Sequence, residues 1–334
     1  MTGDEAMDPL ELAERVRAGG LLAPERPVVV MLSGGRDSVC LLDVAVGVCG
    51  AAAVRALHCN YRLRDGADGD EAHCASLCSE LGVGLEVRRP ALAEGNVQAA
   101  AREARYAAAC DVAGAWGAEV PDANRSAIDV ATGHTASDQA ETVLYRLAAS
   151  PGRRALLGIA PRRGRLVRPL LDVSREQTAA YCRGRGLSWR EDPSNEDLRF
   201  ARVRARRGLV PALRELHPAA EANLARTVAE LRAEAEALDG WVASLLDGAT
   251  GVALAQLRAL PGPLARLLAR RLAEDALGQP APDAAGRLDE VLALDHGGTG
   301  GEIHLARGLR AVVSGGWLRY KVIPPGGADP PGRG

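Results

Sequence analysis

The sequence predicts an α/β fold: a doubly wound parallel sheet followed by a smaller, mainly helical domain. Residues 27–32 form a short valine-rich run bounded by Pro and Gly, which is typical of a strand buried on both faces. Strand-like and helix-like segments then alternate up to residue 147, the pattern of a parallel sheet with helices on both sides. Beyond residue 218, apolar residues recur at helical spacing.

The elements of the first domain follow from this alternation. Strands are expected at residues 27–32, 54–58, 85–88 and 128–132. Helices are expected at residues 39–48, 70–81, 96–116 and 138–147. The polar stretch 118–127 contains proline and is expected to be a surface insertion. A further helix is predicted at 174–185, because Ser174 and Gln177 have the three-residue spacing of a capping box.

The second domain is expected to begin with a long amphipathic helix at residues 218–246. Its apolar residues recur three, four and seven positions apart: Leu224, Val228, Leu231, Leu238, Val242 and Leu245. Helices at 263–277 and 283–294 and a Gly-rich, hairpin-like stretch to about residue 322 should follow. The predicted domains are an α/β domain at 1–215 and a helical domain at 216–323, followed by a disordered tail at 324–334.

Length and cysteine usage place the chain in a broad class. Its 334 residues exceed what one hydrophobic core usually serves. The seven cysteines form neither a CxxC pair nor an even framework, so we expect reduced thiols in a cytoplasmic protein. Cys74 and Cys78 are interpreted as buried small side chains, because no second pair completes a metal site. The sequence shows neither a signal-like segment nor a membrane-spanning stretch, so no membrane association is expected.

Positive charge is concentrated between residues 151 and 214. This segment holds 16 arginines and 6 acidic residues, a balance of +10, although the whole chain has a net charge of −2. A basic segment in an acidic protein favours contact with a polyanion such as a nucleic acid. A solvated, arginine-rich surface is the alternative interpretation.

The strongest sequence signal lies between the first expected strand and the helix after it. Its residues are Ser33, Gly34, Gly35, Arg36, Asp37 and Ser38. At such a junction, free backbone N–H groups and the helix dipole face an anion, glycines let phosphates approach, and serine hydroxyls add donors. The segment has neither a Walker lysine nor a GxGxxG pattern. Asp37 cannot pair with phosphate directly, so we expect it to hold Mg²⁺ or to fix the loop.

A second polar constellation, residues 133–142, follows the fourth expected strand. In doubly wound sheets, ligands bind outside the carboxyl ends of the strands, where this turn lies. If a helix begins near Ser137, Asp138 and Glu141 share one face, where they could bind a cationic amine or accept its proton. The alternative is a pair of first-turn acids favoured by the helix dipole. His134 is a candidate contact for phosphate or substrate.

A third candidate group lies on the expected helix at 96–116. Arg102 and Arg105 are three residues apart and can project towards the same site. Ordinary helix-surface arginines would show the same spacing, so the functional interpretation depends on the neighbouring motifs.

The loop at 33–38 resembles the pyrophosphate loop of N-type ATP pyrophosphatases, which cleave ATP between the α and β phosphates. Further segments follow in an order that resembles one family of these enzymes, the tRNA(Ile)-lysidine synthases. They are His-Cys-Asn-Tyr-Arg-Leu-Arg at 58–64 and residues 96–106, 133–142, 157–159, 168–171, 189–195 and 202–211. The resemblance is strong over about residues 27–215 and weak in the helical remainder. It implies that residues 1–215 are the catalytic domain and residues 216–323 a helical tRNA-binding domain.

The resemblance implies an enzyme that uses ATP, Mg²⁺ and L-lysine to convert the wobble cytidine of tRNA(Ile) with a CAU anticodon into lysidine. The cytosine C2 oxygen would attack the α phosphate, pyrophosphate would leave into the loop, and lysine would displace AMP at C2. The amine must lose its proton, with Asp138 as the first candidate base and Glu141 as the second. Arg102 or Arg105 would place lysine or phosphate. The oligomeric state stays open, a homodimer included.

Two positions depart from the family pattern. Ser137 stands where the family usually has the first of two adjacent aspartates, so the role of that carboxylate is not carried over to this chain. Asp138 fills the second place. Tyr61 stands where the family commonly has a second histidine.

Two other functions compete with lysidine synthesis. One is another tRNA-modifying enzyme of the same superfamily, such as a thiolase, although such thiolases commonly carry paired cysteines or an iron–sulfur site. The other is a nucleotide-binding module without catalysis. Pure nucleotide sensing would not need Asp138 and Glu141.

Overall fold

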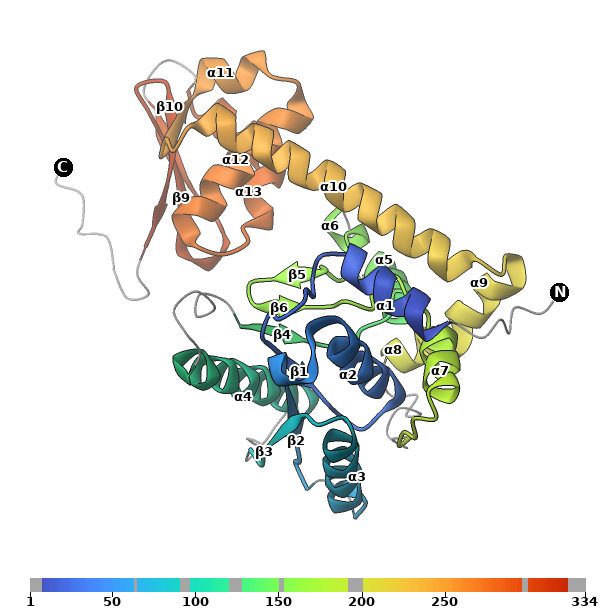
Figure 1. Cartoon of the computed structure of the whole chain (residues 1–334). Helices are drawn as coiled ribbons and strands as arrows, with labels where there is room; N and C mark the ends of the chain where they lie inside the picture. The colour runs from blue at the N-terminus through green and yellow to red at the C-terminus, as the bar shows by residue number, and fades with distance from the viewer. Residues whose placement is uncertain are drawn as a thin grey trace. The chain divides into compact units, whose positions relative to one another are not determined.

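A computed structural model describes residues 8–62, 65–90, 97–119, 128–149, 153–191, 201–295 and 300–323. The chain divides into two compact units, Met1–Leu231 and Arg232–Gly334 (Figure 1). The expected tail at 324–334 and most of the expected insertion at 118–127 lie outside the described residues. Within the described residues, no helix combines the length and the apolar character needed to cross a membrane.

The first unit is built around a six-stranded sheet in the order β3-β2-β1-β4-β6-β5. The strands are β1 (Val28–Met31), β2 (Val54–Cys59), β3 (Gly84–Arg88), β4 (Asp129–Ala131), β5 (Arg162–Arg163) and β6 (Leu166–Val167). Neighbouring strands are parallel except for the β5 and β6 hairpin. The chain runs outward from β1 to β3 and then returns to place β4 on the other side of β1. This confirms the predicted doubly wound sheet, with its topological switch point between β1 and β4.

The helices of the first unit lie between and around these strands, and those that were predicted lie close to the expected positions. They are α1 (Pro9–Ala18), α2 (Arg36–Cys49), α3 (Ala67–Glu80), α4 (Val97–Glu119), α5 (Ala136–Ala149), α6 (Arg153–Leu156), α7 (Arg175–Gly184), α8 (Ala201–Arg204) and α9 (Val210–Leu216), with a 3₁₀ turn at Ala51–Ala53 and a π-helical turn at Ala205–Leu209. Helix α1 and the β5 and β6 hairpin were not predicted. The capping box of α7 is confirmed, because the Ser174 hydroxyl accepts from the Gln177 N–H and the Gln177 side chain accepts from the Ser174 N–H.

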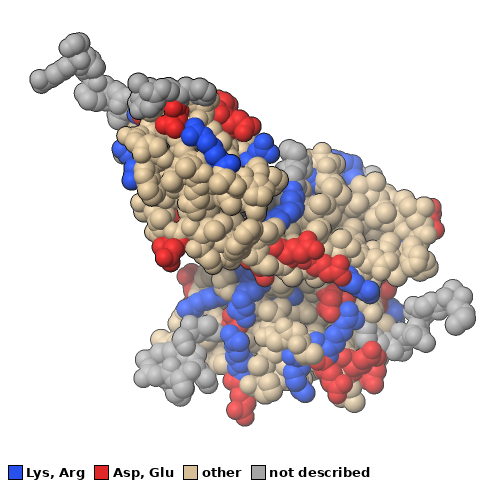
Figure 2. Space-filling view, turned by 90° about the horizontal axis from the view of Figure 1, so that it is seen from above, with Lys and Arg blue, Asp and Glu red and all other residues tan. Residues whose placement is uncertain are grey.

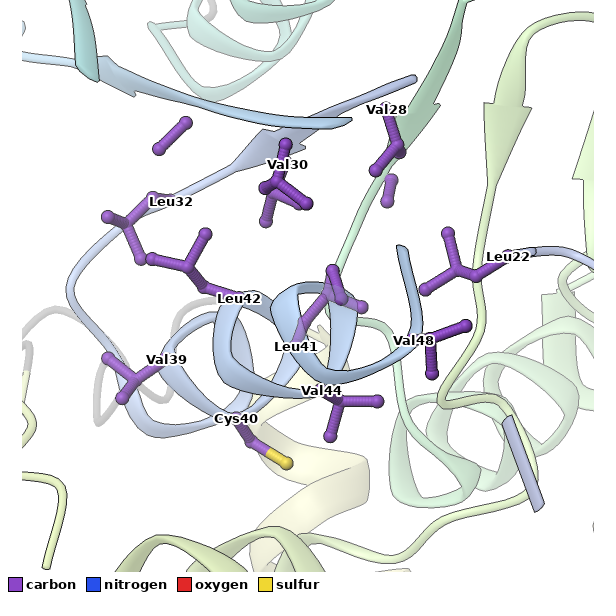
Figure 3. Close-up of a cluster of buried hydrophobic side chains, with 14 of the residues drawn as sticks. Leu22, Val28, Val30, Leu32, Val39, Cys40, Leu41, Leu42, Val44 and Val48 are labelled. Atoms are coloured by element: carbon purple, nitrogen blue, oxygen red, sulfur yellow. The ribbon is translucent and has the colours of Figure 1, made fainter. Parts of the chain in front are cut away.

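Both faces of the sheet are buried, which explains the unbroken apolar run of β1. Val28 and Val30 belong to a core shared with helices α1, α2, α3 and α7. Val29 and Met31 belong to a second core, formed with α4. In Figure 3, Val30 of the strand lies opposite Leu41 and Leu42 of α2. A strand with helices on both sides has no solvent-facing position, so it lacks the alternation of a half-buried strand.

The second unit combines helices with an antiparallel sheet. After α10 (Ala220–Leu246), whose first turns belong to the first unit, come α11 (Leu254–Ala259), α12 (Gly262–Leu277), α13 (Pro282–Gly286) and α14 (Leu288–Ala293). The sheet has the order β7-β10-β9-β8, with β7 (Gly251–Ala253), β8 (Gly301–His304), β9 (Leu309–Ser314) and β10 (Trp317–Val322), and a 3₁₀ turn at Ala306–Gly308. The Gly-rich stretch thus forms three strands of a sheet instead of a single hairpin. Helices and sheet enclose a separate apolar core.

Candidate active site

The loop at 33–38 and the turn at 133–135 meet at the switch point of the sheet. The loop leads from β1 into α2, the turn leads from β4 into α5, and β1 and β4 are adjacent parallel strands. A Cβ atom on Gly133 would lie 2.8 Å from the carbonyl oxygen of Asp37. This position therefore requires glycine, because any side chain would collide with the first turn of α2.

Internal hydrogen bonds shape the loop at 33–38. The Ser38 hydroxyl accepts from the Ser33 N–H at 3.1 Å and donates to the Gly35 carbonyl at 2.8 Å. The Ser33 hydroxyl accepts from the Gly35 N–H at 3.3 Å. Gly34 has φ +82°, a left-handed conformation that favours glycine. The loop is thus a tight turn at a helix start, the geometry that binds phosphates.

Asp138 and Glu141 project from the first turns of α5 onto one guanidinium, that of Arg175. Arg175 Nη2 donates to Asp138 Oδ1 at 2.5 Å, and Nη1 donates to Glu141 Oε1 at 2.6 Å. The Nε atom of Arg175 also lies 3.5 Å from Asp37 Oδ2. Arg175 therefore contacts acidic residues of both sequence motifs. It sits at the start of α7, where the capping box fixes its backbone.

The two carboxylates of α5 differ in solvent exposure and in their hydrogen-bond partners. The Glu141 side chain is 3% exposed and also accepts from Arg206 Nε at 2.7 Å. The Asp138 side chain is 20% exposed, and its second oxygen accepts from the N–H and hydroxyl of Thr135 at 2.9 and 3.0 Å. Glu141 is thus buried between two arginines, whereas part of Asp138 faces solvent.

Opposing effects set the charge of Asp138. Burial alone would raise the pKa of Asp138, but Arg175, His134 and the hydrogen bonds from Thr135 outweigh it and hold this pKa below its usual value. For Arg175, burial opposes the charge, but the attraction of Asp138, Glu141 and Asp37 outweighs it and raises the pKa. Both groups are therefore ionised at neutral pH.

His134 stays neutral in this site. Burial is the main cause that lowers its pKa to about 4, and Arg168, Arg102 and Arg105 lower it further, against an opposing effect of Asp138. One ring nitrogen, Nδ1, lies 2.8 Å from the Thr132 hydroxyl. His134 can therefore offer a neutral ring to a ligand, with its orientation set by Thr132.

Arg102 and Arg105 are exposed on the second turn of α4. Among the described residues, neither forms an ion pair, and the Arg102 guanidinium lies 5.3 Å from the ring centroid of Tyr106. Arg168, which directly follows β6, is 5% exposed, and within the described part of the chain its Nε atom has no hydrogen-bond partner. All three arginines lower the pKa of His134 through their charge. This group of cations is the arginine cluster of the site.

The two departures from the family pattern have structural partners in this chain. The Ser137 hydroxyl is buried, donates to Glu221 Oε2 at 3.0 Å and accepts from the Arg175 N–H at 3.3 Å. A carboxylate from the start of α10 therefore reaches the position where Ser137 lacks one. The Tyr61 hydroxyl donates to the Ala101 carbonyl at 2.7 Å and so fixes the beginning of α4.

Sequence reasoning missed Arg175, Arg206 and Glu221, because each reaches the site only through the tertiary fold.

The folded structure also changes the interpretation of the basic segment at 151–214. Several of its arginines pair with acids from earlier in the chain: Arg162 with Asp129, Arg185 with Asp43, Arg190 with Asp70 and Arg206 with Glu141. On the face drawn in Figure 2, basic and acidic side chains lie close to one another. The balance of +10 therefore does not by itself mark a polyanion-binding surface.

Several predicted features carry no catalytic assignment. Cys74 and Cys78 are buried free thiols, as predicted, and burial is the main cause that raises the pKa of Cys74 to about 12 and that of Cys78 to about 11. The described residues contain no group of three or more acids, histidines or cysteines able to hold a metal. Residues 63–64, 96 and 192–195 of the matching segments lie outside the described residues.

Comparison with known proteins gives consistent matches. The PP-loop domain family matches residues 10–213. A tRNA(Ile)-lysidine synthase of Salinispora tropica is 36% identical over 315 residues, which cover 90% of this chain and 91% of the relative. One of Pseudomonas fluorescens is 41% identical over 218 residues, 63% of this chain, and the match spans only 46% of that longer relative.

One solved structure supports the fold alone. A U34-tRNA thiolase from Methanococcus maripaludis, described with its [4Fe-4S] cluster, superposes with a TM-score of 0.53 at 16% identity. The match covers 66% of this chain and 78% of the thiolase.

Proposed function

This chain belongs to the tRNA(Ile)-lysidine synthase family, and on that premise we propose that it ligates L-lysine to C2 of the wobble cytidine of CAU-anticodon tRNA(Ile). ATP is consumed, and pyrophosphate and AMP are released. The observation that carries the proposal is the joining of the loop at 33–38 to Asp138 and Glu141 through Arg175. This arrangement supports one site in which the turn would bind phosphate and a carboxylate would bind the amine.

The first step is adenylation of the base. The C2 oxygen of cytosine attacks the α phosphorus of ATP, and the bond between the α phosphorus and the bridging oxygen breaks. Pyrophosphate leaves with that electron pair, stabilised by the backbone N–H groups and serine hydroxyls of the loop at 33–38. The AMP-bearing oxygen at C2 then becomes a good leaving group.

In the second step, the ε-amine of lysine attacks C2 and AMP leaves. The side chain that binds this amine is Asp138, because it is ionised and partly exposed, whereas Glu141 is enclosed by two arginines. A carboxylate of low pKa is a weak base for a free ammonium. The bound ammonium has no lone pair, so it first gives up one proton to solvent water, and the neutral amine then attacks C2. Once the C–N bond has formed, the attached N–H is far more acidic, and Asp138 accepts this second proton as AMP leaves. Asp138 thus remains the first candidate for the proton acceptor.

Mg²⁺ is part of the proposal, with Asp37 as its protein ligand. This carboxylate is 21% exposed at the first turn of α2, beside the phosphate-binding turn. Mg²⁺ in nucleotide sites typically uses one or two carboxylates, together with phosphate oxygens and waters, so a single aspartate fits in number. Asp37 Oδ1 accepts from Arg36 and Thr178, so Mg²⁺ would bind at Oδ2, in place of the 3.5 Å contact with Arg175. Bound there, Mg²⁺ would neutralise phosphate charge.

The arginine cluster is assigned to phosphate and not to lysine. The charges of Arg102, Arg105 and Arg168 all lower the pKa of neutral His134, so a lysine ammonium beside that ring would be repelled by the same charges. A phosphate would instead pair with several guanidinium groups. We assign the exposed Arg102 and Arg105 to the anticodon backbone next to the flipped-out cytidine.

The alternatives have less support. A thiolase with an iron–sulfur centre needs clustered cysteines, and the described residues contain no such group. A non-catalytic nucleotide-binding module does not account for Asp138 and Glu141 beside the loop. We place the reaction in the cytoplasm, where a substrate tRNA and seven free thiols would both be stable.

The test is incorporation of labelled lysine into a tRNA(Ile) transcript with a CAU anticodon, with AMP and pyrophosphate measured in parallel. We expect all three products in equal amounts. A transcript with uridine at the wobble position is the matched control and should give none. A folded enzyme that leaves the CAU transcript unmodified would refute the proposed function.

A further inference from the structure

Three carboxylates converge on Arg175, and they differ in their other partners. Asp37 also accepts from Arg36 at 3.2 Å and from the Thr178 hydroxyl at 2.5 Å. Glu141 also pairs with Arg206. Among the described residues, Asp138 has its ion pair with Arg175 alone. Release of Arg175 would therefore leave Asp37 and Glu141 with other cations, but Asp138 with none.

The lysine ammonium and Arg175 need the same acceptor. Asp138 Oδ2 is engaged by Thr135, and Oδ1 is engaged by Arg175 at 2.5 Å. An ammonium that joined Asp138 while Arg175 stayed would place two cations on one oxygen in a largely buried site. Binding of the amine is thus opposed by a cation of the protein itself.

We propose that Arg175 competes with the substrate ammonium for Asp138, and that the phosphates of ATP relieve this competition by attracting Arg175 towards the loop at 33–38. This inference rests on the proposed function and adds to it a coupling between nucleotide and lysine. It makes Arg175 a positioning residue that favours lysine binding after ATP.

The local structure supports such a movement. The Arg175 backbone is fixed by the capping box and by its N–H bond to Ser137, so only side-chain torsions need to change. Its Nε atom already lies 3.5 Å from Asp37, a residue of the loop at 33–38. Phosphate oxygens bind a guanidinium in bidentate fashion, and ATP carries more negative charge than one carboxylate. ATP is therefore able to draw Arg175 away from Asp138.

The experiment is calorimetric titration of L-lysine into the full-length protein without tRNA. Titrations are run with and without Mg²⁺ and an ATP analogue that has a methylene bridge between the α and β phosphates. For the wild type, we expect lysine to bind at least tenfold more tightly with the analogue. For Arg175→Gln, we expect tighter binding than wild type without nucleotide, and a ratio near one between the two conditions.

The direction of the effect separates this role from a purely structural one. If Arg175 only held the site together, Arg175→Gln would weaken lysine binding in both conditions, and this result would overturn the inference. A tenfold ratio that persists in Arg175→Gln would also overturn it, as would a wild type that binds no lysine with the analogue.

Arg185→Gln is the matched control. Arg185 follows the same helix, α7, and pairs with Asp43 of α2 at 2.8 Å, away from the acids of α5. Its variant should keep the wild-type ratio. By linkage, lysine should tighten binding of the analogue by the same factor, which gives a second measurement of the coupling.

Failure of the inference and failure of the proposed function give different results. Lysine incorporation into the CAU transcript without nucleotide-dependent lysine binding would refute only the competition. Nucleotide-dependent lysine binding without incorporation would refute only the proposed function.

Discussion

Arg175 and Asp138 form an ion pair of 2.5 Å between the start of α7 and the first turn of α5. The two residues are 37 positions apart in the sequence and meet beside the loop at 33–38. This pair fixes the carboxylate that we assign to the lysine amine, and it connects that carboxylate to Asp37. The first prediction concerns its removal.

Replacement of Asp138 by asparagine should reduce lysine transfer at least about 100-fold, because the variant lacks the charge that binds and deprotonates the amine. ATP binding should change less than about threefold, because the loop at 33–38 keeps its own hydrogen bonds. Transfer is measured with labelled lysine, and ATP binding by calorimetry. Asp172→Asn, which removes an exposed partner of Arg15, is the control. Full transfer by Asp138→Asn would remove Asp138 from the mechanism.

Replacement of Gly133 by alanine should weaken ATP binding and destabilise the first unit by about 1–3 kcal/mol. The added Cβ would lie 2.8 Å from the Asp37 carbonyl oxygen, so the first turn of α2 must shift. Urea unfolding and nucleotide titration measure the two effects. Gly47→Ala, within α2, is the control. Its added Cβ would meet open space, and alanine favours a helix. Equal behaviour of the two variants would contradict the close approach.

Replacement of Arg102 and Arg105 together by alanine should weaken tRNA binding and leave the KM for lysine unchanged, because these arginines are assigned to phosphate. The slope of log K against log salt should fall by about one unit per lost phosphate contact. Filter binding at several salt concentrations measures this slope. Arg88→Ala, on β3, is a control of similar exposure. An unchanged slope with a raised KM for lysine would assign the arginines to the amino acid.

The buried ring of His134 should make the protein less stable in mild acid. Its pKa of about 4 in the folded protein lies below the unfolded value of about 6.5, so the unfolded chain binds more protons between these pH values. Stability is therefore lost as pH falls through this range, by at most about 2 kcal/mol between pH 7 and pH 5. Urea unfolding of wild type and His134→Gln at both pH values measures it. Equal losses in the two proteins would show that His134 is not responsible.

The Ser137 and Glu221 pair predicts an interaction between two substitutions. Ser137→Asp would restore the carboxylate typical of the family but place it against buried Glu221, so we expect a loss of about 1–3 kcal/mol. Glu221→Gln should relieve that loss in the double variant. The coupling is obtained from the unfolding free energies of the four proteins. Additive effects would show that the two side chains do not interact.

The sequence was sufficient to predict the strands and helices that bring the loop at 33–38 and the segment 133–142 together. Val28–Met31 is apolar on both faces because helices cover both, and the alternation of elements predicts parallel pairing. The conformational need for Gly34 also follows from its place between a strand and a helix. Local rules suffice here, because each depends on residues within one turn or one strand.

The Gly-rich stretch of the second unit was expected to be hairpin-like, and the sequence did not predict that it belongs to a four-stranded sheet. Short strands such as Gly251–Ala253 have little periodicity of their own, and this strand is defined by pairing with Trp317–Val322 more than 60 residues later. The expected helix at 283–294 is two short helices, Pro282–Gly286 and Leu288–Ala293.

By itself, the sequence determined the Gly-rich turn between the first strand and its helix and the shared face of Asp138 and Glu141, because local spacing sets these features. Only the tertiary structure decided which cations meet those carboxylates. Arg175 is 37 residues from Asp138, and Glu221 is 84 residues from Ser137. Coulombic attraction depends on distance in space, and burial strengthens it, so the electrostatics of this site arise only when the chain folds.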